Sequence, residues 1–203
     1  MFGVVRLIIG SIFLGSAILL ISKLIKKHRI LLYIISIVLS AVLVAALAFL
    51  PFENLYTTFE TPEEAYEYFN FGKSDIQLVV KGTKSDLIID NKNGTNRYLI
   101  IPKSGDGWKI GIGANTRRVI QKLHNGIVIY VYQYKATDDF FITVLDTNGG
   151  SAIIADSYNS EFYAIEKINH TIGKVFVTYY AHISGWDNQY WISINDTKIE
   201  FAH

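Results

Sequence analysis

The chain has 203 residues, a formal net charge of +1 and no cysteine, which excludes disulfides, Fe–S clusters, thiol nucleophiles and cysteine-ligated zinc. The charge is distributed unevenly: residues 1–50 contain five Lys or Arg and no Asp or Glu, and residues 51–203 carry a net charge of −4. A domain of that charge lacks the clustered cations that displace counterions from nucleic acid, so we expect no nucleic-acid partner.

Two apolar stretches at the amino terminus predict a pair of membrane-spanning helices, at about 3–25 and 30–50. The second stretch would form about 30 Å of helix, the thickness of the hydrocarbon core of a bilayer. Pro51 would end that helix. A cleaved signal peptide is the alternative for the first stretch, but no small-x-small cleavage site precedes Lys23. Residues 1–51 are therefore predicted to be a transmembrane hairpin whose partner is the lipid bilayer.

The loop between the two predicted spans, 26–29, is basic and contains Lys26, Lys27 and Arg29. The positive-inside rule places such a loop in the cytoplasm. We therefore expect a two-span protein of the cell membrane with both termini and the soluble domain outside the cytoplasm. Neither span contains Asp, Glu or His, so transport of ions by this chain alone is not expected.

Small residues four positions apart predict where the two helices meet. Ser11 and Gly15 have this spacing in the first helix, and Ser36 and Ser40 have it in the second. Small side chains let helix backbones approach closely in lipid. The alternative is that Gly, Ala and Ser are simply common in membrane helices.

Residues 52–203 are predicted to form one β-rich domain outside the cytoplasm. It begins with a short helix, because Thr61, Pro62 and Glu64 have the residue types and spacing of a capping box with proline at the first helical position. After it the apolar residues recur with a period of two, interrupted by turn formers such as Asn125-Gly126, which is a strong hairpin signal. Strands are expected at 76–81, 86–90, 97–102, 108–112, 117–123, 127–135, 139–146, 151–156, 162–168, 174–182, 189–195 and 197–201.

This pattern predicts a membrane-anchored, mainly-β protein with an antiparallel β-meander or sandwich after the helical hairpin. A weak similarity between 128–148 and 174–197 leaves a propeller-like arrangement open.

The sequence contains no catalytic motif that we could identify. It has no Gly-x-Ser-x-Gly elbow, no histidines at metal-ligand spacing and no dinucleotide fingerprint, so we expect no metal and no cofactor, and a non-enzymatic role is favoured. Asp138, Asp139 and Asp187 lie in equivalent turns of the weak repeat and would form an acid/base pair if they met. Solvated turn carboxylates are the simpler interpretation.

Aromatic residues are the unusual feature of the domain. Tyr180, Trp186, Tyr190 and Trp191 are candidate binding residues, because aromatic rings at a rim stack on sugars or anchor a protein partner. The alternative is that they fill the β core. Arg117 and Arg118, with Lys122, form a small basic group on the strand near 117–123 that would suit an anionic wall polymer or lipid head groups. A solvated strand face is the simpler interpretation of this group.

These features favour a membrane-tethered, non-enzymatic binding or accessory module of a bacterial cell envelope, outside the cytoplasm, with a protein or cell-wall glycan as its partner. An envelope hydrolase that uses the turn carboxylates is one alternative. An accessory subunit of a membrane complex, assembled through the hairpin, is the other.

Overall fold

The computed structural model describes residues 2–24, 30–111, 116–148, 151–169, 174–187 and 189–201. The protein is mainly β, with antiparallel sheets. It divides into two compact units, Met1–Thr57 with Glu67–Lys73, and Thr58–Tyr66 with Ser74–His203. We refer to them as the helical unit and the β unit.

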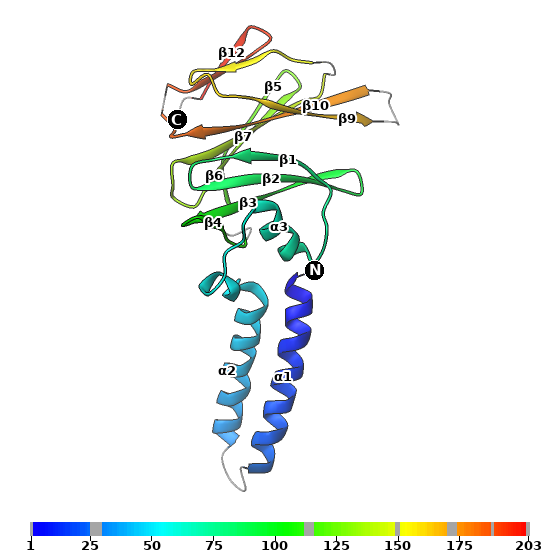
Figure 1. Cartoon of the computed structure of the whole chain (residues 1–203), viewed down its shortest axis with the longest axis vertical. Coiled ribbons are helices and arrows are strands. Elements are labelled where there is room, and N and C mark those ends of the chain that lie inside the picture. Colours follow the sequence, from blue (N-terminus) through cyan, green and yellow to red (C-terminus); the bar gives the residue numbers. More distant parts are fainter. Residues whose placement is uncertain are drawn as a thin grey trace. The chain divides into compact units, whose positions relative to one another are not determined.

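The helical unit contains α1 (Phe2–Leu24), α2 (Ile30–Phe49) and a 3₁₀ turn, η1 (Phe52–Leu55). The two long helices lie side by side (Figure 1). They pack closely at Gly10, which is buried: a Cβ added there would lie 3.1 Å from Cγ1 of Val44. Glycine at this position lets the facing valine pack directly on the backbone of α1.

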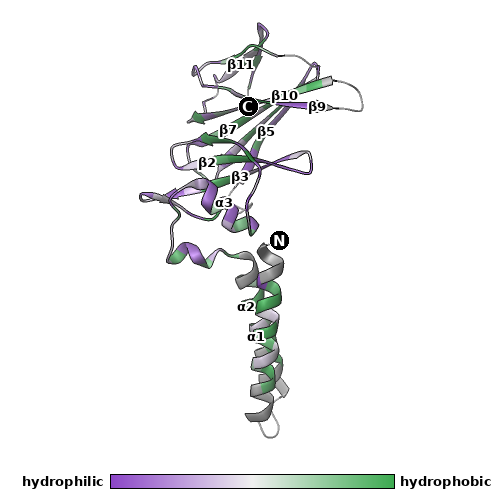
Figure 2. Ribbon diagram, turned by 45° about the vertical axis from the view of Figure 1, so that its right-hand side comes forward, coloured by the Kyte–Doolittle hydropathy of each residue, from purple (hydrophilic) through white to green (hydrophobic). Residues whose placement is uncertain are grey.

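The prediction of two membrane spans is wrong. Among the described residues, no helix is both long enough and apolar enough to cross a membrane. The predicted spans at 3–25 and 30–50 and the expected cell-membrane location with both termini outside the cytoplasm are corrected accordingly. In Figure 2 the ribbon of these two helices is green at described apolar residues.

The β unit contains three antiparallel sheets (Figure 1). The first has the order β1 (Ile76–Lys81), β2 (Ser85–Lys92), β3 (Thr95–Ser104) and β4 (Gly107–Trp108). The second has the order β5 (Thr116–His124), β6 (Ile127–Tyr134), β7 (Asp139–Asp146), β10 (Lys174–Ser184) and β9 (Tyr163–Asn169). The third has the order β12 (Thr197–Glu200), β11 (Trp191–Ile194) and β8 (Ile154–Asp156).

The five-stranded sheet is the middle layer of the β unit, and its two faces contribute to two different cores. On β7, Phe140, Ile142 and Val144 join the core shared with the three-stranded sheet. Phe141 joins the core shared with the four-stranded sheet, to which Leu87 and Ile89 of β2 also belong. A strand buried on both faces has to be apolar at nearly every position, which explains the run Phe140-Phe141-Ile142. The three sheets therefore stack as layers, a sandwich with one layer added.

Tight turns with left-handed backbone connect neighbouring strands. Asn125 and Gly126 have φ of 46° and 79°, and they join β5 to β6 as the sequence predicts. Asn93 and Gly94 join β2 to β3 with φ of 53° and 74°. Positive φ at both central residues is the type I′ turn, whose twist matches that of the flanking strands and which favours Asn-Gly.

The predicted short helix is α3 (Pro62–Asn70). The backbone N–H of Glu64 donates to Oγ1 of Thr61, which is one half of the predicted capping box. The Glu64 carboxylate accepts from the N–H of Glu60, one residue before the predicted N-cap. In the β unit, Ala65 and Tyr66 of α3 are buried with Ile88 and Ile101 on the outer face of the four-stranded sheet.

We expect Phe141→Ala to lower the free energy of unfolding by about 3–5 kcal/mol, because Phe141 is fully buried between two sheets and its removal leaves a cavity. Leu123→Ala, at a side chain that is 71% exposed, is the control and should change it by less than about 0.5 kcal/mol. Urea denaturation of the full chain measures both. If Phe141→Ala and Leu123→Ala lowered the free energy of unfolding equally, the layered packing would be contradicted.

Candidate functional site

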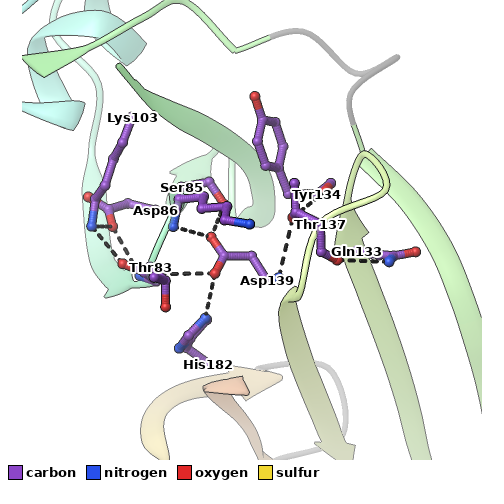
Figure 3. Close-up of polar contacts among 11 residues, drawn as sticks. Thr83, Ser85, Asp86, Lys103, Gln133, Tyr134, Thr137, Asp139 and His182 are labelled. Carbon is purple, nitrogen blue, oxygen red and sulfur yellow. Dashed lines mark hydrogen bonds and ion pairs between the residues drawn. The ribbon is translucent and has the colours of Figure 1, made fainter. Parts of the chain in front are cut away.

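A buried carboxylate, Asp139, joins the four-stranded sheet to the five-stranded sheet (Figure 3). Its Oδ1 accepts hydrogen bonds from the N–H of Thr83 and from Nε2 of His182, each at 3.0 Å. Its Oδ2 accepts from the N–H of Lys84 at 2.6 Å and from the hydroxyl of Ser85 at 2.9 Å. The β1–β2 turn is thereby held against the start of β7 and against β10.

Burial alone would raise the pKa of Asp139, but the hydrogen bonds from His182, Lys84, Ser85 and Thr83 outweigh it and lower the pKa to about 2. The turn also packs closely here. A Cβ added to Gly82 would lie 2.4 Å from the carbonyl oxygen of Ser85 and 2.9 Å from the ring of Phe141. Glycine is therefore required where the turn meets the middle sheet.

This cluster contains Ser, His and Asp but lacks the order that nucleophilic catalysis needs. In a catalytic triad the histidine lies between serine and aspartate and takes the serine proton. Here Asp139 lies between Ser85 and His182 and accepts from both. Ser85 is also fully buried. The arrangement is that of a polar clamp between two sheets.

The two other carboxylates of the predicted acid/base group, Asp138 and Asp187, are exposed. Asp138 is exposed, and its carbonyl accepts from the N–H of Gly185 at 2.7 Å, so the β6–β7 turn does lie beside the turn that contains Asp187. Asp187 is exposed and its Oδ1 caps the N–H of Gln189. Neither of the two cavities discussed below is lined by these aspartates. Within the described part of the chain, no group of three His, Asp or Glu could hold a metal ion.

A second polar feature lies where β3 meets β5 and β6. A cavity of about 360 Å³ is lined by a set of residues that we call the tyrosine pocket: Tyr98, Leu99, Thr116, Arg118 and Tyr132. The rings of Tyr98 and Tyr132 lie 4.8 Å apart, and their hydroxyls share a hydrogen bond of 2.6 Å. Tyr98 remains 46% exposed, so the pocket is open to solvent.

A β-bulge in β5 directs two polar side chains into the tyrosine pocket. Thr116 pairs with Tyr134 and Arg118 pairs with Tyr132, which places both on the face toward the four-stranded sheet. The register then shifts between Arg118 and Ile120, and Ile120 packs into the opposite core. A bulge inserts one residue and re-aims the side chains on either side of it. The edge strand can thus present polar residues to the pocket and still bury its apolar end.

The groups that face the tyrosine pocket can donate several hydrogen bonds. Burial and the hydrogen bond with Tyr98 raise the pKa of Tyr132, so its hydroxyl stays protonated at neutral pH. Whichever tyrosine donates in the shared bond, the other keeps a free O–H. Oγ1 of Thr116 is buried and has no hydrogen-bond partner among the described residues. The guanidinium of Arg118 lies 5.6 Å from the ring centre of Tyr130 and adds a positive charge.

The predicted aromatic binding residues lie in or beside the cores. Tyr180 is buried between the first two sheets, and Tyr190 is fully buried and donates to Asp156 at 2.9 Å. Trp186 is half-buried with its ring 4.4 Å from that of Tyr190, and its Nε1 has no partner among the described residues. Trp191 is half-buried under the ammonium of Lys198. The binding role of these four residues stays a prediction.

The predicted helix-contact residues differ in their surroundings. Ser40 lines a cavity of the helical unit. Ser11 is exposed and bonds the carbonyl of Leu7 in its own helix, and a Cβ added to Gly15 would meet no atom within 4 Å. The side chain of Ser36 lies outside the described residues, as do Lys26, Lys27 and Arg29 of the predicted loop.

Sequence reasoning missed the helix contact at Gly10 and the grouping of the residues that line the tyrosine pocket. Gly10 has no small partner four residues away in either direction, so the small-residue spacing could not find it. Tyr98, Thr116 and Tyr132 come from three strands. In the sequence Tyr132 stands out as the middle one of three alternate tyrosines and Arg118 stands out for its charge, but neither signal points to the other pocket residues.

We expect Asp139→Asn to be less stable than the natural chain at neutral pH and to lose less stability in acid. On folding, the pKa of this carboxylate falls from 3.8 to about 2. Above pH 4 the ionised carboxylate therefore adds about 2 kcal/mol to the free energy of unfolding, and this contribution is lost as the pH falls toward 2. Urea denaturation at several pH values measures this, with Asp138→Asn at the exposed neighbouring position as the control. Equal acid sensitivity of the natural chain and Asp139→Asn would contradict the clamp.

Compared with models of protein families, with curated proteins and with solved structures, the chain matches none. No residue role can therefore be transferred from a relative. Function has to be inferred from the chemistry of the cavities themselves.

Proposed function

We propose that the protein is a non-enzymatic binding module whose β unit takes a saccharide that carries a carboxylate. The observation that carries this proposal is the tyrosine pocket, a cavity of about 360 Å³ with two tyrosines, an arginine and a buried threonine hydroxyl. Its volume lies within the range of small-molecule sites, about 300–1,000 Å³, and suits one or two sugar rings.

The groups around the pocket match the chemistry of such a ligand. Sugar hydroxyls both donate and accept, so they can pair with the hydroxyls of Tyr98 and Tyr132. The exposed ring of Tyr98 offers a surface for the apolar face of a sugar. Arg118 can hold a carboxylate through two parallel hydrogen bonds.

The Asp139 cluster does not favour a hydrolase. Both carboxylate oxygens of Asp139 are occupied by donors that hold the two sheets together, and Ser85 is buried beneath them. A nucleophile or general base has to reach a substrate within hydrogen-bond distance. The non-enzymatic module is therefore the better interpretation of the described residues.

We expect the full chain to bind a disaccharide that contains glucuronate or galacturonate more tightly than maltose, with an affinity that falls as salt is added. Arg118→Ala should weaken binding of the acidic disaccharide about 10- to 100-fold, the effect of losing hydrogen bonds to a charged group. Isothermal titration calorimetry measures the preference between the two disaccharides, its dependence on salt and the effect of Arg118→Ala.

Arg117→Ala is the matched control, because Arg117 pairs with Gln133 and points to the opposite face of the same strand. The Arg117→Ala variant should bind the acidic disaccharide with an affinity within about twofold of that of the natural chain. The proposal fails if maltose binds as well as the acidic disaccharide, or if the Arg117 and Arg118 variants lose affinity equally.

A further inference from the structure

The helical unit contains a larger and more apolar cavity than the tyrosine pocket. It has a volume of about 520 Å³ and lies between α1, α2 and η1. Its apolar wall is formed by residues from all three elements: Ile9, Phe13, Leu14, Leu43, Val44 and Phe52. A cavity of this size with a mostly apolar wall is typical of a site for a small molecule.

One end of the cavity is polar and contains an ion pair. Arg6 pairs with Oε1 of Glu53 and also donates to the carbonyl of Leu50 at 2.5 Å. The hydroxyl of Tyr68 donates to the same Oε1 at 3.2 Å. Burial lowers the pKa of Arg6, but an arginine remains protonated, so the two charges neutralise each other.

The second oxygen of Glu53 has no donor. Glu53 is only 9% exposed and lines the cavity, and its Oε2 is buried without a hydrogen-bond partner among the described residues. A buried carboxylate oxygen that accepts no hydrogen bond is unfavourable, and such atoms are rare in folded proteins. Glu53 lines the polar end of this apolar cavity, but its Oε2 has almost no accessible surface, so a donor in the cavity reaches Oε2 only when the carboxylate turns.

We infer that this cavity binds a single-chain amphiphile whose uncharged head donates a hydrogen bond to Oε2 of Glu53. The alkyl chain lies along the apolar wall, and each methylene that enters strengthens binding by about fourfold. The head is a hydroxyl or an amide. A carboxylate head would face the Glu53 carboxylate, and an ammonium head would lie near the Arg6 guanidinium.

The test titrates the full chain with decanol, decyl methyl ether and decanoate by isothermal titration calorimetry. Decanol should bind at least about 10-fold more tightly than the ether, which has the same chain and no donor, and than decanoate. Monodecanoylglycerol shows whether the hydroxyl head can also come from a glyceride. Equal affinity for decanol and the ether overturns the inference, as does the absence of binding by both hydroxyl compounds.

Two variants locate the site. Ala17 lines the cavity, so Ala17→Phe should fill it and lower the affinity for decanol about 10-fold or more. Ala41→Phe makes the same change at an exposed position of α2 that does not line the cavity, and it should leave the affinity unchanged. Circular dichroism of both variants controls for folding. Equal affinity of Ala17→Phe and Ala41→Phe for decanol overturns this placement.

Discussion

The middle sheet of the β unit has to be covered on both faces, and most of the unit follows from that constraint. Its alternate side chains enter two cores, one shared with each flanking sheet. An antiparallel sheet more often leaves one face to solvent. Here the flanking sheets are required partners of the middle one, because Phe141 and Ile142, next to each other on β7, are both fully buried on opposite faces.

Stacking sheets on both faces forces turns and strand ends into the interior, and aspartates satisfy the polar groups there. Asp139 accepts two backbone N–H groups of the β1–β2 turn. Asp86, on β2 of the four-stranded sheet, accepts from Trp108 and pairs with Lys103. Asp156 accepts from two backbone N–H groups and from Tyr190. Buried carboxylates are tolerated when each of their oxygens has a donor. Glu53 of the helical unit departs from this rule, because one of its oxygens has no such donor among the described residues.

The elements of the β unit were largely predictable from the sequence, because period-two alternation and turn residues are local signals. The strand expected at 139–146 has those bounds, and Thr61 caps α3 as its spacing predicts. The strand expected at 108–112 is shorter, since β4 pairs with β3 only at Gly107 and Trp108. The prediction of membrane spans from the apolar stretches was wrong, because no helix among the described residues is long and apolar enough to cross a membrane.

The candidate sites were much less predictable, because they depend on long-range pairing. β7 lies beside β10, with β8 and β9 between them in the chain, and this pairing is what brings His182 to Asp139. Tyr98 and Tyr132 meet only because two sheets stack. No spacing in the sequence encodes either contact.

The bulged strand β5 has a consequence for how copies of this chain behave in concentrated solution. It is an edge strand, and an unprotected edge can pair with a strand from another molecule and start aggregation. Charged side chains and an irregular register both oppose such pairing, and β5 has Arg117, Arg118 and a bulge. Lys122 also donates to the backbone carbonyl of Glu200, which ties this edge to β12. The β-bulge that shapes the tyrosine pocket thus also opposes the addition of a foreign strand to this edge of the sheet.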